Sequence, residues 1–513
     1  MAEIEAKFII RRPEQVAAVL RALSANRFSV EDHGMTTHVD RYFDTEDWSI
    51  LAAGWACRVR RRNGGATLTL KSLQGPDGNI FIREEVSQSI TDEDAELSLS
   101  LPPGPVRDRL VEFIDDKPVM ELFRLASERT VYVIASAGLQ GVQVELDLDR
   151  SRIEAEKRTE KATGVLEFTE LELELLSGEL SDLESIASLL RDGAGLMQAK
   201  FSKFERGLQA AGLEMDLLTE KPRATSLTED DPALALLYQY VSDQLQIIQR
   251  HHPRALEGID PEGVHQMRVA SRRLRAILKA FRGILGDEVV VRFNGELRWL
   301  AQNLGRARDA DVTEMSARDS EEPDAGHYER FLAEETVNAY EHLVDVLESE
   351  RCSTLEKDLA QFSAAGPGSE IQEQFGKLSI ADCADQLIHA ALSKLLEQGD
   401  AITADSAARE LHKLRIRAKR FRYLLDFFSS VQAEKWFEMT EALKRLQDIL
   451  GEHQDAVTAR AQLADYAASL PTDAEGREKL AGTARLMRAE AERIATSRQQ
   501  FSTAWSDFKN TLI

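Results

Sequence analysis

Two carboxylates and one ammonium group alternate at the start of the chain, at Glu3, Glu5 and Lys7. In a β-strand, residues i, i+2 and i+4 point to the same face. The branched and aromatic residues nearby, such as Ile4 and Phe8, suit a strand. A face of this composition makes a poor core, but it suits a divalent cation that carries a phosphate chain. The alternative is an edge strand whose charged face is solvated.

Later segments repeat this alternation with either basic or acidic side chains. The basic faces hold Arg58, Arg60, Lys71 and Arg83, and the acidic faces hold Glu145, Asp147, Asp149, Glu170, Glu172 and Glu174. Buried charges of both signs are costly unless they pair or bind something. A triphosphate with Mg²⁺ or Mn²⁺ would satisfy both sets, because arginine and lysine bind phosphate oxygens and carboxylates bind the metal.

A sheet is needed to bring these side chains together. Alternation and turn residues predict eight strands, at 1–10, 38–45, 55–62, 66–71, 81–86, 128–134, 142–149 and 168–175, with turns at 63–65 and 75–78. Helices are predicted at 13–31 and 180–190, and residues 92–125 are helical or irregular. If an antiparallel sheet of eight strands closes into a barrel, it leaves room for one small ligand. An ordinary sandwich would instead put the charged faces in water.

The composition limits the kinds of partner. The 513 residues carry a net charge of −24, which on average repels nucleic acid. The three cysteines are far apart without a CxxC pair, so neither a disulfide framework nor a zinc site is suggested. The acidic N-terminus does not resemble a secretory signal, and no segment reaches the ~18 apolar residues of a membrane helix. We therefore expect a cytoplasmic protein with no membrane and no nucleic-acid partner.

The ordered motifs of residues 1–207 resemble the CYTH family, the triphosphate tunnel metalloenzymes. Glu3-Ile-Glu-Ala-Lys7 is similar to the ExExK signature of that family. The resemblance continues through Tyr42-Phe-Asp-Thr45, Arg58 and Arg60, Lys71, Arg83 with Glu85, Arg124 with Arg129, the acidic strand Glu145–Asp149, the ELELE segment and Ser202-Lys203. It implies an eight-stranded antiparallel tunnel that hydrolyses or cyclises triphosphates with a divalent metal.

The same resemblance implies roles for individual residues. Glu3, Glu5 and Lys7 would be catalytic, and the two glutamates would hold or orient a second metal or the attacking water. The metal ligands would be Glu3, Glu5, Asp149, Glu172 and Glu174, with Glu145 and Asp147 as alternatives to Asp149 and with Glu170 in a supporting position. The phosphate chain would contact Lys7, Arg58, Arg60, Lys71, Arg83, Arg129 and Lys203. Ser151 stands where the family commonly has glycine.

Beyond a linker, the chain changes to helical periodicity and contains a duplication. The segment 264–278 matches 411–425 with an offset of 147, and 304–309 matches 450–455 with an offset of 146. Each half is therefore predicted to be a four-helix unit. We expect a tunnel domain at 1–208, a linker at 209–228 and a helical domain at 229–513, with repeats of about 229–378 and 379–513.

The duplicated helix carries a basic stripe in each copy. The candidate anion-binding residues are His265, Arg268, Arg272, Arg273, Arg275, His412, Arg415, Lys419, Arg420 and Arg422. Like charges at i and i+4 repel, so something anionic must offset them. That is either a bound anion, or neighbouring acids such as Asp309, Asp311 and Asp455, or both. A long inorganic anion suits two such stripes better than a duplex, since the remaining surface is acidic.

This half resembles the CHAD domain over roughly residues 229–513, through HxxRxxxRRLR, HxxRxxxKRFR and the ARDxD loop. The second copy departs from that loop at His453-Gln-Asp455-Ala-Val457. The family resemblance implies polyphosphate binding. Together the halves resemble bacterial CYTH-CHAD inorganic triphosphatases. The prediction is a metal-dependent hydrolase of tripolyphosphate with a polyphosphate-binding domain. A class IV-like adenylyl cyclase, a hydrolase of another triphosphate, or a non-catalytic polyphosphate adaptor are the alternatives, and the oligomeric state stays open.

Overall fold

The structure is a computed structural model that describes residues 2–62, 65–73, 80–91, 102–115, 117–136, 141–159, 162–215, 218, 227–318, 326–403 and 405–512. The predicted turn at 75–78 and most of the turn at 63–65 lie outside these residues. The chain divides into two compact units, Met1–Arg223 with Glu257–Glu262, and Ala224–Leu256 with Gly263–Ile513. No helix in the described part of the chain is long and apolar enough to cross a membrane.

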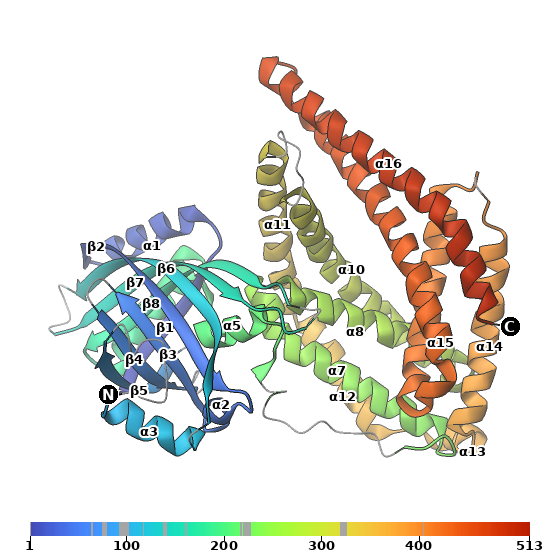
Figure 1. Ribbon diagram of the computed structural model, residues 1–513, viewed down its shortest axis with the longest axis horizontal. Coiled ribbons are helices and arrows are strands. Elements are labelled where there is room, and N and C mark those ends of the chain that lie inside the picture. Colours follow the sequence, from blue (N-terminus) through green and yellow to red (C-terminus); the bar gives the residue numbers. More distant parts are fainter. Residues whose placement is uncertain are drawn as a thin grey trace. The chain divides into compact units, whose positions relative to one another are not determined.

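The first unit is a closed antiparallel barrel of eight strands, as predicted (Figure 1). The strands are β1 (Ala2–Ile10), β2 (Phe28–Thr45), β3 (Trp55–Arg62), β4 (Gly65–Ser72), β5 (Phe81–Ile90), β6 (Val119–Ser136), β7 (Gln143–Ala155) and β8 (Val165–Ser177). They run in the order β5-β4-β3-β2-β6-β7-β8-β1, and pairing of β1 with β5 closes the barrel. A two-residue strand, β9 (Met197–Gln198), lies beside β1.

Several element boundaries differ from the sequence prediction, most of all near the starts of β2 and β6. Helix α1 (Pro13–Ala25) ends six residues before the predicted 31, and β2 already begins at Phe28. Strand β6 begins at Val119, inside a segment predicted to be helical or irregular. The reason is that β2 and β6 pair with each other along their whole lengths, from Phe28 opposite Ser136 to Thr45 opposite Val119. Such long-range pairing overrides local propensity.

Helices cover the outer face of the barrel and leave its charged face inside. Helices α1 and α4 (Leu180–Ala194) pack on β1, β7 and β8 through a core that includes Leu23, Leu173 and Leu190. Helix α3 (Pro105–Ile114), beside the short α2 (Ser49–Ala52), packs near β3 and β4. Toward one end, the inward positions turn apolar, and α5 (Lys203–Ala210) packs there through Phe204 and Leu208.

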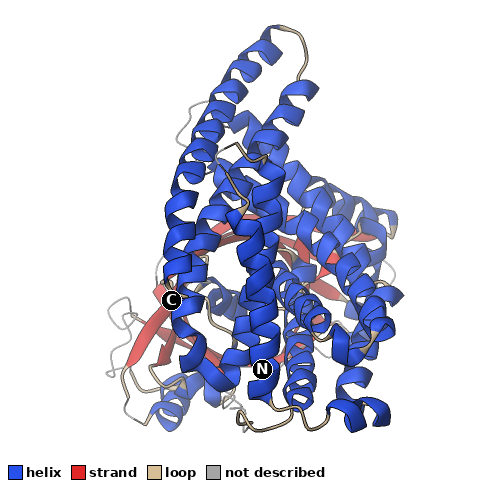
Figure 2. Cartoon of the chain, turned by 90° about the vertical axis from the view of Figure 1, so that its right-hand side faces the viewer, coloured by secondary structure: helices blue, strands red, loops and turns tan. Residues whose placement is uncertain are grey.

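The second unit is built of helices (Figure 2). They are α7 (Ala233–Glu257), α8 (Pro261–Ala280), α9 (Arg282–Leu285), α10 (Asp287–Arg318), α11 (Gly326–Leu347), α12 (Glu350–Ala365), α13 (Ser369–Phe375), α14 (Ile380–Asp400), α15 (Ala408–Ser469) and α16 (Ala474–Asn510). Helix α15 is interrupted at Gln432, where the backbone is not helical. Helices α7 and α14 begin 147 residues apart, the same offset as the duplicated motif. On that offset, α7, α8, α10 and α11 correspond to α14, the two halves of α15, and α16, while α9, α12 and α13 are additional helices among those described.

Candidate functional site

Charged side chains form rows across neighbouring strands inside the barrel. In one row, Glu5 of β1 lies opposite Glu174 of β8, which lies opposite Glu145 of β7. One step along, Lys7, Glu172 and Asp147 form the next row, and then Glu170, Asp149 and Arg129 form a third. This register follows from the two-residue period of a strand, which keeps alternate side chains on one face.

Glu172 contacts three cations at the centre of the barrel. Lys7 donates a hydrogen bond to it, Arg129 contacts it at 2.8 Å, and Lys203 lies 3.2 Å away. Burial alone would raise the pKa of Glu172, but Lys203, Lys7 and Arg129 hold this pKa well below its ordinary value. Glu172 is therefore a carboxylate that stays ionised in a buried position.

Arg129 and Lys203, which contact Glu172, also contact neighbouring carboxylates. Arg129 donates to Asp149 at 2.6 and 2.8 Å and also contacts Asp147. Lys203, from the first turn of α5, contacts Asp149 and lies 2.9 Å from Glu170. Atoms of Asp149, Glu170 and Glu172 lie within 4.8 Å of one another, close enough to hold one metal ion.

A second group lies where β1, β4 and β5 meet. Lys71 contacts Glu3 and lies 3.3 Å from Glu5, and Arg83 lies 3.6 Å from Glu5. Glu5 itself is 2% exposed. Burial alone would raise its pKa, but the charges of Lys7, Lys71 and Arg83 lower it. Glu3 and Glu5 thus share one ammonium group, which a phosphate chain would compete for.

The predicted phosphate-binding arginines of β3 have a partner that the sequence analysis did not find. Asp40 of β2 is completely buried, and Arg60 donates two hydrogen bonds of 2.7 Å to it, while Arg58 lies 3.8 Å away. Burial would raise the pKa of Asp40, yet the two arginines hold it far below its ordinary range. The alternation of His38, Asp40 and Tyr42 was the available signal, because it places Asp40 on the inner face.

Glu174 and Asp147, two carboxyl groups of the charged rows, have raised pKa values. Burial and the charges of Glu3, Glu5 and Glu145 raise the pKa of Glu174 to about 7. Burial, opposed by Arg129, raises that of Asp147 to about 7, and its Oδ1 has no hydrogen-bond partner among the described residues. Neighbouring carboxylates contribute to both shifts, and a bound cation would offset this repulsion. Their oxygen-only donor set fits a hard divalent ion such as Mg²⁺ or Mn²⁺.

Most of these side chains line one cavity of about 640 Å³. Among the predicted site residues, it is lined by Glu3, Lys7, Arg58, Arg60, Lys71, Arg83, Arg129, Glu172, Glu174 and Lys203. Glu5 and Asp149 lie behind this lining and contact it through Lys7, Lys71, Arg129 and Lys203. The cavity therefore combines cations that can bind phosphate with carboxylates that can bind metal.

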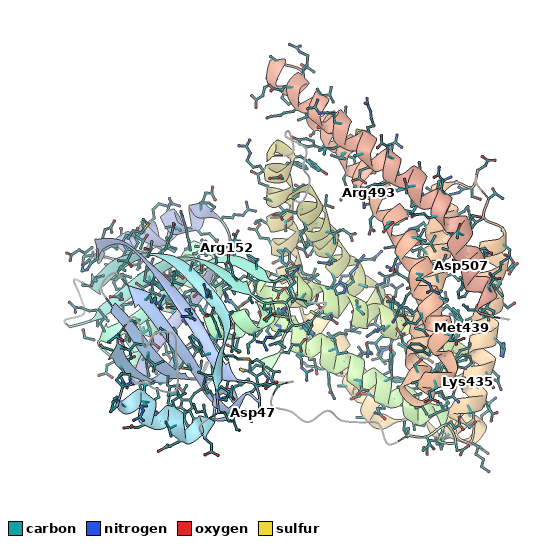
Figure 3. All side chains as sticks on the ribbon, viewed as in Figure 1. Asp47, Arg152, Lys435, Met439, Arg493 and Asp507 are labelled. Carbon is teal, nitrogen blue, oxygen red and sulfur yellow. The ribbon has the colours of Figure 1, made fainter. Side chains whose placement is uncertain are left out.

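The helical unit holds a separate cavity of about 540 Å³ where the two basic stripes converge. Of the predicted anion-binding residues, it is lined by His265, Arg268 and Arg272 of α8 and by His412, Arg415, Lys419 and Arg422 of α15. Sequence reasoning did not single out Arg308 of α10 or Arg493 of α16 (Figure 3), which also line it. Arg308 belongs to the duplicated motif at 304–309, which was the signal for it. The prediction that this motif is a loop was wrong, because it lies within helix α10.

Three predicted anion-binding residues do not line this cavity. Arg273 follows Arg272 directly and so points to another side of α8. There it lies 3.8 Å from Asp426. Arg275 lies one turn beyond Arg272, where burial and Arg420 lower its pKa. Arg275 and Arg420 thus form a basic group beyond the cavity.

Acids compensate the cavity only in part. Arg268 lies 3.3 Å from Asp309 and Arg415 lies 3.5 Å from Asp455, equivalent pairs in the two repeats. Asp311 instead accepts a hydrogen bond of 3.1 Å from Tyr340. Burial and the neighbouring Arg415 and Arg272 lower the pKa of Lys419 to about 7. The lining of the cavity holds more basic than acidic side chains, an arrangement that suits an anion.

Comparisons with known proteins divide the chain in the same way. The family model of the CYTH domain matches residues 1–208, and that of the CHAD domain matches residues 239–464. The Mycobacterium tuberculosis protein Rv2226, described as uncharacterised, is 27% identical over 508 residues, which cover 92% of this chain and 90% of that protein. YjbK of Bacillus subtilis, proposed to be a triphosphatase, is 29% identical over 106 residues, which cover 20% of this chain and 53% of YjbK.

Solved structures match each part separately. The crystal structure of the CHAD domain from the plant Ricinus communis is 27% identical, covers 56% of this chain and 96% of that domain, and has a TM-score of 0.47. HpAC1 from Hippeastrum, proposed to be an adenylyl cyclase and reported with a dominant triphosphatase activity, is 19% identical, covers 41% of this chain and 96% of HpAC1, and has a TM-score of 0.30.

Proposed function

Because residues 1–208 form a CYTH domain and residues 239–464 a CHAD domain, we propose that this chain is a metal-dependent inorganic triphosphatase. It hydrolyses tripolyphosphate to pyrophosphate and phosphate, and its helical unit binds inorganic polyphosphate. The observation that carries the proposal is the pairing of carboxylates with phosphate-binding cations around one cavity. A site that only gripped polyphosphate would need the cations but not the row of Glu5, Glu174 and Glu145.

The residues of the barrel divide the work of an in-line attack by water on a terminal phosphoryl group. When bound, a divalent ion such as Mg²⁺ or Mn²⁺ supplies charge neutralisation at the phosphate oxygens. Glu172 and Glu174 are proposed to hold it, and Glu3 and Glu5 to orient the attacking water or a second ion. Arg58, Arg60, Lys71 and Lys203 bind the phosphate oxygens, and their fixed charges stabilise the negative charge of the transition state.

The cations that would bind phosphate contact the carboxylates that would bind metal, as Lys71 does with Glu3. Metal binding releases the cations and phosphate binding releases the carboxylates, so each ligand favours the other. The cavity lining favours an inorganic substrate. Its described aromatic residues, Tyr42 and Phe204, are buried and pack against each other at 5.8 Å, so neither offers a ring face to a nucleobase.

The proposal is tested by phosphate release from tripolyphosphate, ATP, thiamine triphosphate and long-chain polyphosphate, each with Mg²⁺ or Mn²⁺. We expect fast release from tripolyphosphate that stops with excess EDTA, while polyphosphate binding persists, because the helical cavity binds through side-chain cations. Conversion of ATP to a cyclic nucleotide would contradict the proposal and support the adenylyl cyclase alternative. Polyphosphate binding without release from any substrate would make the chain an adaptor.

The affinity for polyphosphate is expected to depend on pH through Lys419. A bound polyanion raises the pKa of this ammonium group from about 7, so above pH 7 binding takes up a proton. Affinity for polyphosphate should therefore fall as the pH rises from 7 to 9, by up to tenfold per unit. Other charged or titratable side chains also line the cavity around Lys419, among them Arg268, Arg272, Arg415, Asp455, His265 and His412.

The comparison that isolates Lys419 is the same titration with Lys419→Arg, whose charge persists over this range. Calorimetry in two buffers of different ionisation enthalpy would count the protons taken up. An identical pH slope in Lys419→Arg and in the unmodified chain would contradict the assignment.

A further inference from the structure

A group of three potential metal ligands lies in the helical unit, apart from both cavities. His252 belongs to α7, and Cys352 and Glu356 belong to α12. Their ligand atoms all lie within 4.8 Å of one another, and Nδ1 of His252 is 3.1 Å from Oε1 of Glu356. Cys352 and Glu356 are four residues apart, so they share one face of their helix. The sequence analysis did not find this group, because 100 residues separate His252 from Cys352.

The burial of the three side chains differs in a way that suits an ion arriving from solvent. The Cys352 thiol is completely buried, whereas the side chains of His252 and Glu356 are 22% and 18% exposed. The two exposed ligands can reach outward, while the thiol lies at the inner end of the group. Of the described residues, this is the one cysteine found in such a cluster.

We propose that His252, Cys352 and Glu356 bind a divalent cation of the Zn²⁺ class. One sulfur, one nitrogen and one oxygen donor form the mixed set that this borderline ion accepts, and water would complete a tetrahedron. Bond lengths of about 2.0–2.3 Å place tetrahedral ligand atoms roughly 3.3–3.6 Å apart. The separation of 3.1 Å between His252 and Glu356 is already close to this. Rotation of these two side chains can shorten their distances to Sγ of Cys352, which are at most 4.8 Å.

The ion must displace a proton to bind. A cysteine binds a metal ion as the thiolate, whereas without metal the buried Cys352 is a thiol. Binding forms the metal–sulfur bond and releases the thiol proton to solvent. The barrel cavity differs in kind, since its candidate ligands are carboxylate oxygens. A thiolate bond is therefore a signature that an ion in the barrel cannot produce.

The position of the group indicates a structural role. Helix α12 lies outside the duplicated repeat, and α7 is the first helix of that repeat. An ion held by both helices would tie the additional helix to the repeat. We therefore expect the bound ion to raise the thermal stability of the helical unit.

The experiment is a titration of the full chain, first stripped with EDTA, with Co²⁺ as the spectroscopic probe. We expect the near-ultraviolet charge-transfer band of a cobalt–thiolate bond at one equivalent, and its displacement by Zn²⁺. Cys352→Ser should abolish the band, and the matched control Cys383→Ser, another buried cysteine in a helix, should keep it.

Two further variants keep the test independent of core packing. His252→Gln and Glu356→Gln change partly exposed side chains, and each should weaken Co²⁺ binding at least about tenfold. Far-ultraviolet circular dichroism and melting in EDTA confirm that each variant is folded. An unmodified chain without a thiolate band would overturn the proposal and leave an ordinary histidine–glutamate pair beside a buried thiol. A band that survives in Cys352→Ser, or unchanged in both glutamine variants, would overturn it as well.

Discussion

Replacement of Glu172 by glutamine is expected to lower kcat for tripolyphosphate on the order of 10²–10³-fold. The side chain is proposed to hold the catalytic metal, and it contacts Lys7, Arg129 and Lys203. Its loss removes a metal ligand and leaves one excess positive charge in a buried position. The free energy of unfolding in EDTA should therefore fall as well, by roughly 3 kcal/mol.

Glu174→Gln separates the two effects. Neighbouring carboxylates already repel Glu174 and raise its pKa to about 7, so its neutralisation should not lower stability in EDTA, although it should still reduce activity. Glu167→Gln is the matched control on the same strand, because Glu167 points outward and pairs with the exposed Arg152 (Figure 3). Steady-state phosphate release and thermal melts check all three variants. A Glu172→Gln enzyme with more than a tenth of the original kcat would refute the assigned role.

The double variant Arg268→Ala/Arg415→Ala is expected to lose polyphosphate affinity by about 100-fold or more. Each arginine occupies the equivalent position in one repeat, and the two line the same cavity. A hydrogen bond that involves a charged group contributes about 1.5–3 kcal/mol, so the loss of two exceeds 100-fold even at the lower limit. The salt dependence of binding should also become shallower, since fewer phosphate charges are neutralised.

A control with the same change in charge is available on the same unit. Arg292→Ala/Arg351→Ala removes two exposed arginines that pair with Asp358 and Glu296 and do not line the cavity. Fluorescence anisotropy with labelled polyphosphate at several salt concentrations compares the two double variants. Equal affinity loss in both would mean that polyphosphate binds by overall charge and not in the cavity.

The eight strands and the helical character of the second unit could be predicted because their signals are local. The period of two in the ELELE segment and the period of about 3.6 after residue 230 need only neighbouring residues to be recognised. The start of β2 at Phe28 could not be predicted in this way. Its pairing partner, Ser136, is more than 100 residues away.

The sequence by itself determined which residue types face the interior of the barrel and which lie along the basic stripes, because alternation and helical spacing assign the faces. Only the tertiary structure decided which of them meet. Strand register placed Glu5, Glu174 and Glu145 in one row and Glu172 among three cations. Helix packing brought Arg268 and Arg415 to one cavity, and brought His252 to Cys352. These contacts depend on distant segments whose approach is set by barrel closure and core packing, which no local pattern encodes.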